Sequence, residues 1–203
     1  MQPGYKNITD KKFKQIIDNL YEILSCCELC GHRCKVNRFK NELGFCGASY
    51  KLKISSYNLH FGEEKPISGY NGSGTIFFSH CNLRCVFCQN YEISQLAEGI
   101  EISEEKLAEV MLELQRQNAH NINFVSPTHF LPQIIKALYL ASKSGLNIPV
   151  VYNTGGYDNK EVIKILDGII DIYMPDMKYS DNKFSEIYSK AKDYPEVNKE
   201  TVK

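Results

Sequence analysis

Three cysteines, Cys81, Cys85 and Cys88, form a Cys-x3-Cys-x2-Cys run within one short segment of the chain. Their thiolates are soft ligands, and a compact set of this kind suits an iron–sulfur cluster. A cubane cluster is normally held by four cysteines, so three of them leave one iron without a protein ligand. An open iron can bind a second molecule, which makes this segment a candidate centre for chemistry.

Two other interpretations of these three cysteines stay open. Structural zinc sites usually combine two pairs of ligands separated by a longer gap, and reduced cysteines are frequently buried core residues. The preceding residues 74–78 form a short apolar run that predicts a buried strand. Because α/β barrels place their sites at the carboxyl ends of strands, a cluster-binding loop is favoured over both alternatives.

A second set of cysteines lies nearer the amino terminus. Cys27, Cys30, Cys34 and Cys46 supply four thiolates within twenty residues, and Cys26 and His32 are spare candidates. This polar, glycine-bearing stretch has few apolar side chains around which to fold, so we expect a metal that stabilises it. Zinc and a second iron–sulfur cluster both fit four thiolates. Unligated thiols in a reduced protein are the alternative.

The composition restricts the class of protein. The chain has 203 residues, of which 43% are hydrophobic and 24% charged, and this suits one globular domain with a small appendage. Basic and acidic residues both total 24, so no excess charge indicates binding to nucleic acid or to a membrane surface. The amino terminus lacks the apolar core of a signal peptide. Closely spaced cysteines in such a chain are typical of metal sites in a reduced compartment, and we expect a cytoplasmic protein.

Alternating apolar patterns predict the elements that position the cysteines. Helices are expected at residues 10–25, 103–117, 131–144, 160–166 and 183–192, and strands at residues 51–61, 75–79, 121–126, 149–153 and 169–174. Asp10 and Ser103 are the expected helix caps, and Gly145 is an expected helix end. From residue 75 onward, strands and helices alternate, which predicts parallel strands joined by right-handed crossovers. A polar tail without a further element is expected after residue 192.

Polar residues follow the predicted parallel strands. The later strand ends supply hydroxyls, amides, a carboxylate and an ammonium group, from Ser126, Thr128, Asn153, Thr154, Asp176 and Lys178. If the strands are parallel and adjacent, these groups gather with the cysteines on a single rim. Loops of this kind also tend to be polar simply because they face water, so the pattern alone leaves each individual role open. His80 and His129 lie near the same rim, and we expect them to be hydrogen-bonding wall residues.

Five runs of this chain resemble the radical S-adenosylmethionine (SAM) superfamily, and within it the pyruvate formate-lyase-activating enzyme-like proteins. These runs are residues 30–38, 72–78, 81–94, 123–130 and 151–157. The resemblance implies an α/β fold, specifically a partial (β/α)6 barrel, with residues 61–203 as the radical SAM core and residues 1–60 as a helical, cysteine-rich metal-binding segment. It also implies a [4Fe–4S] cluster whose open iron binds S-adenosyl-L-methionine and cleaves it reductively to a 5′-deoxyadenosyl radical.

The resemblance also implies roles around the first cysteine set. Cys81, Cys85 and Cys88 would ligate the [4Fe–4S] cluster. Phe87 would lie against the adenine of S-adenosylmethionine, with Gln89 nearby.

On the later strands, this sequence departs from the family pattern at one place. The Gly-Gly-Glu run that usually binds the methionine amino group is replaced by Ser126-Pro127-Thr128. Hydroxyls or backbone carbonyls would then receive the ammonium group. Asn153 and Thr154 match the family's polar pair after the third strand. Asp176 and Lys178 match its Asp-x-Lys after the fourth.

The expected function is therefore hydrogen-atom abstraction by a radical SAM enzyme. Its substrate would be a small molecule or a protein, such as a glycyl radical enzyme, and its electron donor a flavodoxin or ferredoxin. A two-cluster electron-transfer protein and a zinc-binding interaction module are the alternatives, although the set at Cys81 supplies only three of the four ligands that an ordinary cluster needs. With four parallel strands instead of six, the core would be incomplete at its carboxyl end. Its fourth strand, residues 169–174, would then be an unpaired edge.

Overall fold

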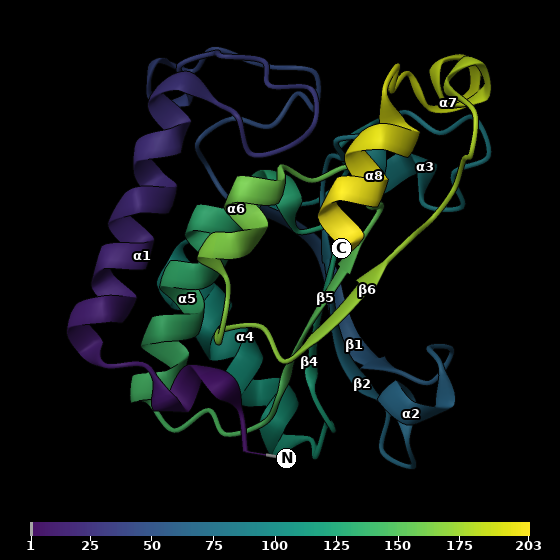
Figure 1. The fold of residues 1–203 in the computed structure, drawn as a ribbon. Coiled ribbons are helices and arrows are strands. Elements are labelled where there is room, and N and C mark those ends of the chain that lie inside the picture. Colours follow the sequence, from purple (N-terminus) through teal and green to yellow (C-terminus); the bar gives the residue numbers. More distant parts are fainter. Residues whose placement is uncertain (1) are drawn as a thin grey trace.

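The structure, a computed structural model, describes residues 2–203 and arranges them as one mixed six-stranded sheet with helices packed on one face (Figure 1). The strand order is β3-β1-β2-β4-β5-β6. The four parallel strands are β2 (Ser73–Phe78), β4 (Ile122–Val125), β5 (Val150–Thr154) and β6 (Ile172–Pro175). The antiparallel strands are β1 (Lys53–His60), which pairs with β2, and β3 (Ile100–Glu101), which pairs with β1.

The predicted run of parallel strands is confirmed, whereas the predicted partial (β/α)6 barrel is not. Within residues 2–203 the sheet is open, with β3 at one edge and β6 at the other. Its two additional strands are antiparallel and come from segments on either side of β2 in the sequence. The fold is therefore an α/β arrangement with a mixed sheet rather than the expected partial barrel of parallel strands.

Period-two alternation places different side chains on the two faces of the sheet. The face beneath the helices is apolar, and Ile76, Phe78 and Phe124 join the main hydrophobic core there. The opposite face includes Thr75 and Asn123, which are paired neighbours on β2 and β4 and are both buried. Apolar burial against the helices therefore stabilises the sheet, while its other face retains polar groups.

The helices begin and end close to the predicted positions. They are α1 (Asp10–Ile23), α4 (Glu104–Arg116), α5 (Leu131–Lys143), α6 (Lys160–Ile165) and α7 (Asn182–Ser189), with short helical turns α2 (Lys65–Ser68) and α3 (Tyr91–Ser94). Ser103 caps α4 as predicted, because its side chain accepts a hydrogen bond from the Lys106 amide. The predicted cap of α1, Asp10, is wrong by one residue. Thr9 has the extended backbone of a cap and accepts from the Lys12 amide, which places Asp10 in the first turn.

The expected polar tail instead forms an additional helix, α8 (Tyr194–Val202), which lies beside the carboxyl end of β5 (Figure 1). The Tyr194 hydroxyl lies 2.8 Å from the carbonyl oxygen of Gly155. The Asn198 amide donates to the carbonyl of Gly156 at 2.9 Å. These contacts of α8 are polar, and its sequence lacks the apolar stripe that normally predicts a helix. The sequence pattern therefore did not indicate α8.

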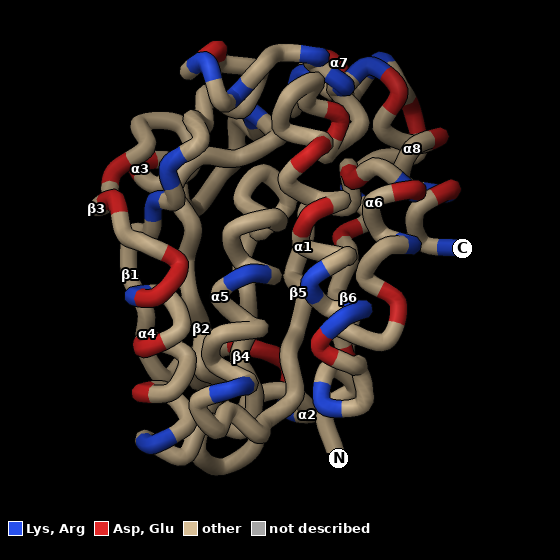
Figure 2. Tube along the Cα trace, turned by 90° about the vertical axis from the view of Figure 1, so that its left-hand side faces the viewer, with Lys and Arg blue, Asp and Glu red and all other residues tan. Residues whose placement is uncertain are grey.

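The outer surface carries both signs of charge. Lys and Arg are interspersed with Asp and Glu along the trace (Figure 2), in agreement with the zero net charge. Among residues 2–203, no helix is both long and apolar enough to cross a membrane.

Candidate active site

A cavity of about 420 Å³ opens at the carboxyl ends of the parallel strands. Segments that follow all four of these strands contribute to its walls, as the parallel arrangement predicted. The predicted site residues that line it are Cys81, Cys85, Cys88, Phe87, Gln89, Ser126, Asn153, Thr154, Asp176 and Lys178. The structure thus brings together groups that lie up to 97 positions apart in the sequence, from position 81 to position 178.

The loop that carries the three cysteines is fixed by its neighbours on both sides. The amide of Ser79 donates to the carbonyl of Lys53 on β1 at 3.1 Å. Farther along, the amides of Arg84 and Val86 donate to the carbonyls of Ser189 and Tyr188, at 3.0 and 2.9 Å, at the end of α7. These backbone contacts preorganise the loop between β1 and α7 before any ligand binds.

Each of the three sulfur atoms has a polar neighbour. The Leu83 amide donates to Cys81 Sγ at 3.4 Å, and the Ser189 hydroxyl donates to Cys85 Sγ at 2.9 Å. Cys88 Sγ lies 3.1 Å from the hydroxyl of Ser94. Burial raises the pKa of the Cys81 thiol to about 12, to which its neighbours Cys85 and Cys88 contribute. A cationic metal centre would remove this penalty, since ligation deprotonates a thiol.

The donor set consists of three cysteine sulfur atoms that line one cavity. Within residues 2–203, no three His, Cys, Asp or Glu side chains are placed so as to enclose one metal ion. A cubane cluster separates its ligating sulfurs more widely than a single zinc ion does, because the four irons and four sulfides lie between them. Three soft sulfur ligands facing a cavity therefore fit a [4Fe–4S] cluster with one open iron.

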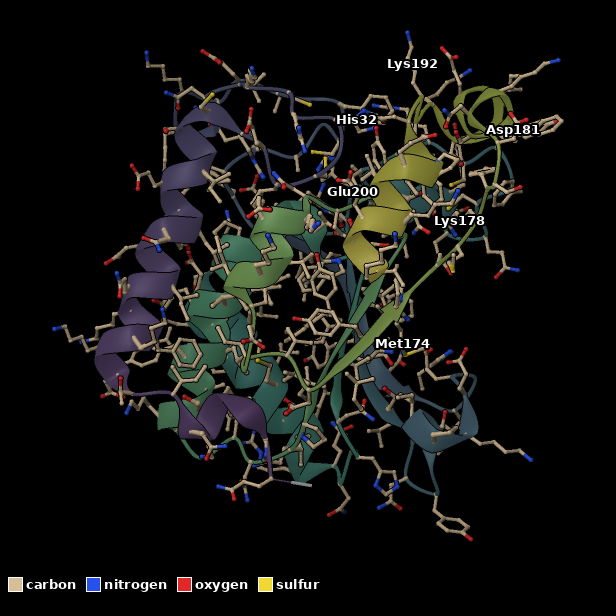
Figure 3. The ribbon with its side chains drawn as sticks, viewed as in Figure 1. His32, Met174, Lys178, Asp181, Lys192 and Glu200 are labelled. Carbon is tan, nitrogen blue, oxygen red and sulfur yellow. The ribbon has the colours of Figure 1, made fainter. Side chains whose placement is uncertain are left out.

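A positive charge stands beside the cysteines. Lys178 Nζ forms an ion pair with Asp176 Oδ2 at 2.5 Å, and both residues line the cavity (Figure 3 labels Lys178). Burial lowers the pKa of Lys178, but the Asp176 carboxylate outweighs this effect, and the net pKa lies above its usual value. Lys178 is therefore an ammonium group available to an anionic ligand atom.

Thr128 is the one predicted cofactor-binding residue from the strand ends that does not line this cavity. Its hydroxyl is buried and donates to Asp158 Oδ1 at 2.6 Å. Thr154 donates to the other carboxylate oxygen at 2.7 Å, and the hydroxyl of Tyr152 donates to Oδ1 at 3.0 Å. Asp158 therefore fixes the side chain of Thr154 at the cavity wall, a positioning role that sequence reasoning missed.

The two histidines near the rim differ in position. His80 lines the cavity, whereas His129 is only 3% exposed and lies behind it. His129 Nε2 lies 2.7 Å from the carbonyl oxygen of Ser79, so this nitrogen carries the proton and donates. Burial lowers the pKa of His129 to about 3, which keeps the ring neutral. His129 thus supports the loop in front of Cys81.

The amino-terminal cysteines lie next to this site but outside the cavity lining. The backbone of Cys30 pairs with that of Asp158 in an isolated antiparallel bridge. His32 Nε2 lies 3.0 Å from the carbonyl oxygen of Asn82, the residue after Cys81. Figure 3 shows His32 in this amino-terminal loop.

The structure combines an α/β sheet with three cysteines that directly follow one parallel strand. These cysteines face a polar cavity at the strand ends. This combination is typical of radical SAM proteins. The chain belongs to the Radical SAM superfamily, which matches residues 75–203. Membership implies an enzyme that uses a [4Fe–4S] cluster and S-adenosylmethionine.

Two curated relatives come from Methanocaldococcus jannaschii, and both are named as uncharacterized. Uncharacterized protein MJ0674 is 37% identical over 205 residues, which cover 95% of this chain and 56% of the relative. Uncharacterized protein MJ0808 is 27% identical over 160 residues, which cover 69% of this chain and 46% of the relative. The chain thus spans about half the length of the curated relatives it matches.

Proposed function

We propose that the [4Fe–4S] cluster of this radical SAM enzyme is ligated by Cys81, Cys85 and Cys88, and that S-adenosylmethionine occupies the adjoining cavity. The observation that carries the proposal is that these three cysteines share one cavity with the polar ends of the other three parallel strands. When bound, the cluster reduces S-adenosylmethionine and so supplies a radical that abstracts a hydrogen atom from a substrate.

The residues of the chain would bind and orient the zwitterionic cofactor. Lys178 offers an ammonium group to a carboxylate, while the side chains of Ser126 and Asn153 offer a hydroxyl and an amide on the same cavity wall. Phe87 is 56% exposed and contributes to the lining, so its ring is an accessible surface for an adenine base. Gln89 is a further polar group on this side of the cavity.

The substrate would approach from a second cavity on the polar side of the sheet. This cavity, of about 520 Å³, shares Asn153 and Asp176 with the cofactor cavity and is also lined by Glu63. The Glu63 carboxylate is an acidic lining group, and burial raises the pKa of Glu63. A cavity that combines a carboxyl group with the amide of Asn153 favours a polar substrate.

A protein substrate such as a glycyl radical enzyme, and a flavodoxin or ferredoxin as electron donor, are proposed partners in a cytoplasmic setting. Their support is the apolar surface beside the cofactor cavity. Val86, Tyr91 and Met177 are exposed and are sequence neighbours of lining residues. Exposed apolar groups gathered near a site are typical of docking surfaces.

The test is anaerobic reconstitution with iron and sulfide, followed by reductant and S-adenosylmethionine and an assay for 5′-deoxyadenosine. We expect its formation by the natural chain and by Cys26→Ser, an exposed cysteine outside the cavity, and none by Cys85→Ala. Full activity of Cys85→Ala would contradict the ligand assignment. A reducible cluster without 5′-deoxyadenosine would favour the electron-transfer alternative. Zinc without the broad visible absorption of a cluster would favour the interaction module.

A second metal, zinc or an iron–sulfur cluster, is also proposed at Cys27, Cys30, Cys34 and Cys46. Its support is the placement of four cysteines in one loop that packs beside the cofactor cavity through His32.

A further inference from the structure

The amino-terminal cysteine loop (residues 27–46) is held in a conformation that its own sequence does not favour. The amide of Cys27 donates to the carbonyl of Val36, and the amide of Lys35 donates to the carbonyl of Cys27, both at 2.9 Å. Between these contacts, Arg33 and Lys35 have φ values of 42° and 57°. Residues that carry a side chain adopt this left-handed region only at a steric cost. Such backbone persists where the surroundings fix it.

Backbone amides in this loop are directed at its sulfur atoms. The Phe45 amide donates to Cys34 Sγ at 3.3 Å. The His32 amide acts in the same way on Cys30, and the Ala48 amide acts in the same way on Cys46. In both pairs the cysteine lies two residues before the amide donor. The Leu83 amide has this same relation to Cys81 in the cofactor cavity. Amide donors favour the negatively charged form of a sulfur ligand, but burial outweighs them and raises the pKa of Cys30 and Cys46, so these thiolates would form when a metal binds.

An unneutralised positive charge lies beside these cysteines. Arg38 is only 1% exposed, and its guanidinium donates to the carbonyls of His129 and Ser49. Its Nε has no hydrogen-bond partner among residues 2–203, and no carboxylate in this part of the chain forms an ion pair with it. The guanidinium does act electrostatically on Cys46. A buried cation without a counter-ion is unfavourable, and carbonyl contacts alone do not neutralise it.

We infer that Cys27, Cys30, Cys34 and Cys46 together bind an anionic metal–thiolate centre, and that Arg38 is its buried counter-ion. Four thiolates retain a net negative charge around a zinc dication, and also around a cubane cluster whose core carries two positive charges. Binding of Zn²⁺ releases the thiol protons with no change of oxidation state, and so does the transfer of a preassembled cubane core that already carries two positive charges. This inference rests on the second metal site proposed above and adds the residue that balances its charge.

Such a centre would also brace the cofactor site. His32 stacks on Phe45 with ring centroids 3.7 Å apart, and Arg84 of the first cysteine loop donates to the carbonyl of Phe45 at 3.0 Å. On the other side, the Asn159 amide donates to the carbonyl of Glu28 at 2.7 Å. The amino-terminal loop therefore contacts both the cavity cysteine loop and the segment after β5.

The test uses a triple variant, Cys81/Cys85/Cys88→Ala, which lacks the cavity ligands. Anaerobic titration with Co²⁺, competition with Zn²⁺, and reconstitution with iron and sulfide would each be followed by absorption and metal analysis. We expect about one cobalt or zinc, or about four irons, per chain. Adding Cys27→Ser should abolish this binding, whereas adding Cys26→Ser should retain it. A folded triple variant that binds none of these metals would overturn the metal site.

Arg38→Met and Arg38→Gln, made in the triple variant, test the counter-ion. We expect metal affinity to fall about 10- to 100-fold, as for other groups that support metal ligands. Arg38→Lys should lose less affinity because it keeps the charge, and Arg116→Met on the exposed end of α4 should lose none. Unchanged affinity in a folded Arg38→Met or Arg38→Gln protein would overturn this role, as would equal losses for Arg38→Lys and Arg38→Gln. Because the readout is metal affinity, failure here is distinct from failure to cleave S-adenosylmethionine.

Discussion

The two cysteine loops use the same ligand type in different surroundings. The loop with Cys81 opens onto a cavity of about 420 Å³, whose polar walls come from three other strand ends. The amino-terminal loop has a fourth cysteine, a buried arginine and a backbone constrained by its own hydrogen bonds. Catalytic metal sites keep a position open, whereas structural sites are closed by protein ligands. The comparison therefore supports the proposals that the first loop carries the chemistry and that the second stabilises the fold.

The largest expected effect is on 5′-deoxyadenosine formation, which should depend much more on the cysteines of the first loop than on those of the second. Replacing Cys81, Cys85 or Cys88 by alanine should reduce 5′-deoxyadenosine formation to background, because an iron loses its only protein ligand. Replacing Cys30 by alanine should leave measurable formation. Both rates are read by chromatography after anaerobic turnover with dithionite. Equal and complete losses from both loops would break the comparison.

The next effect separates the loops by stability. Cys30→Ala should lower the free energy of unfolding by more than about 2 kcal/mol, since it removes a ligand of a structural metal. Cys88→Ala should cost less, because its cavity is open to solvent on one side. Urea denaturation of the metal-loaded proteins, followed by circular dichroism, measures both values. The exposed Cys26→Ser is the matched control, and a larger loss from Cys88→Ala would reverse the assignment.

The cations beside the two loops provide a third test. Lys178 faces an open cavity and carries a raised pKa, whereas Arg38 is enclosed. Lys178→Met should raise the KM for S-adenosylmethionine about tenfold or more, since it removes a charge-assisted contact, and should leave the amino-terminal metal in place. Lys192→Met is the control, because this lysine is on the surface and pairs with Glu186 at 3.6 Å. An unchanged KM would exclude Lys178 as a cofactor ligand.

Local sequence signals predicted much of the frame that supports these loops. Three of the four parallel strands could be predicted from the sequence because β2, β4 and β5 are short apolar runs buried beneath helices. The cap at Ser103 was readable because capping depends on one residue and the next turn. The meeting of the strand ends followed from parallel topology alone.

Features that depend on tertiary contacts could not be predicted in this way. Arg38 reads in the sequence as one more surface charge, and its burial arises from contacts with residues 11 and 91 positions away. Asp158 is similar, because its three hydroxyl donors come from β5 and from the turn after β4. Strand β3 was missed because its two residues are too few to form a local pattern, and its pairing with β1 depends on the tertiary fold.

The smallest expected effect concerns His129, which lies between the two loops. Its carbonyl accepts from Arg38 of the amino-terminal loop, and its Nε2 donates to Ser79, just before the cavity cysteines. Burial lowers its pKa to about 3, with Arg38 and His80 also acting in this direction. An unfolded histidine has a pKa of about 6.5, so the unfolded state binds a proton first as the pH falls.

The sign of the pH dependence follows from that depressed pKa. The stability that neutral His129 contributes is complete above about pH 6.5 and is lost as the pH falls toward 3. Between pH 6.5 and 5.5 this loss amounts to about 1 kcal/mol, which is below the ~1.4 kcal/mol for one full proton over one pH unit because the unfolded histidine is already half protonated at pH 6.5. His129→Gln should therefore reduce the pH dependence of the unfolding free energy over this interval. Urea denaturation at each pH provides the comparison. Identical slopes for natural and His129→Gln proteins would show that His129 does not link the loops as a neutral, buried ring.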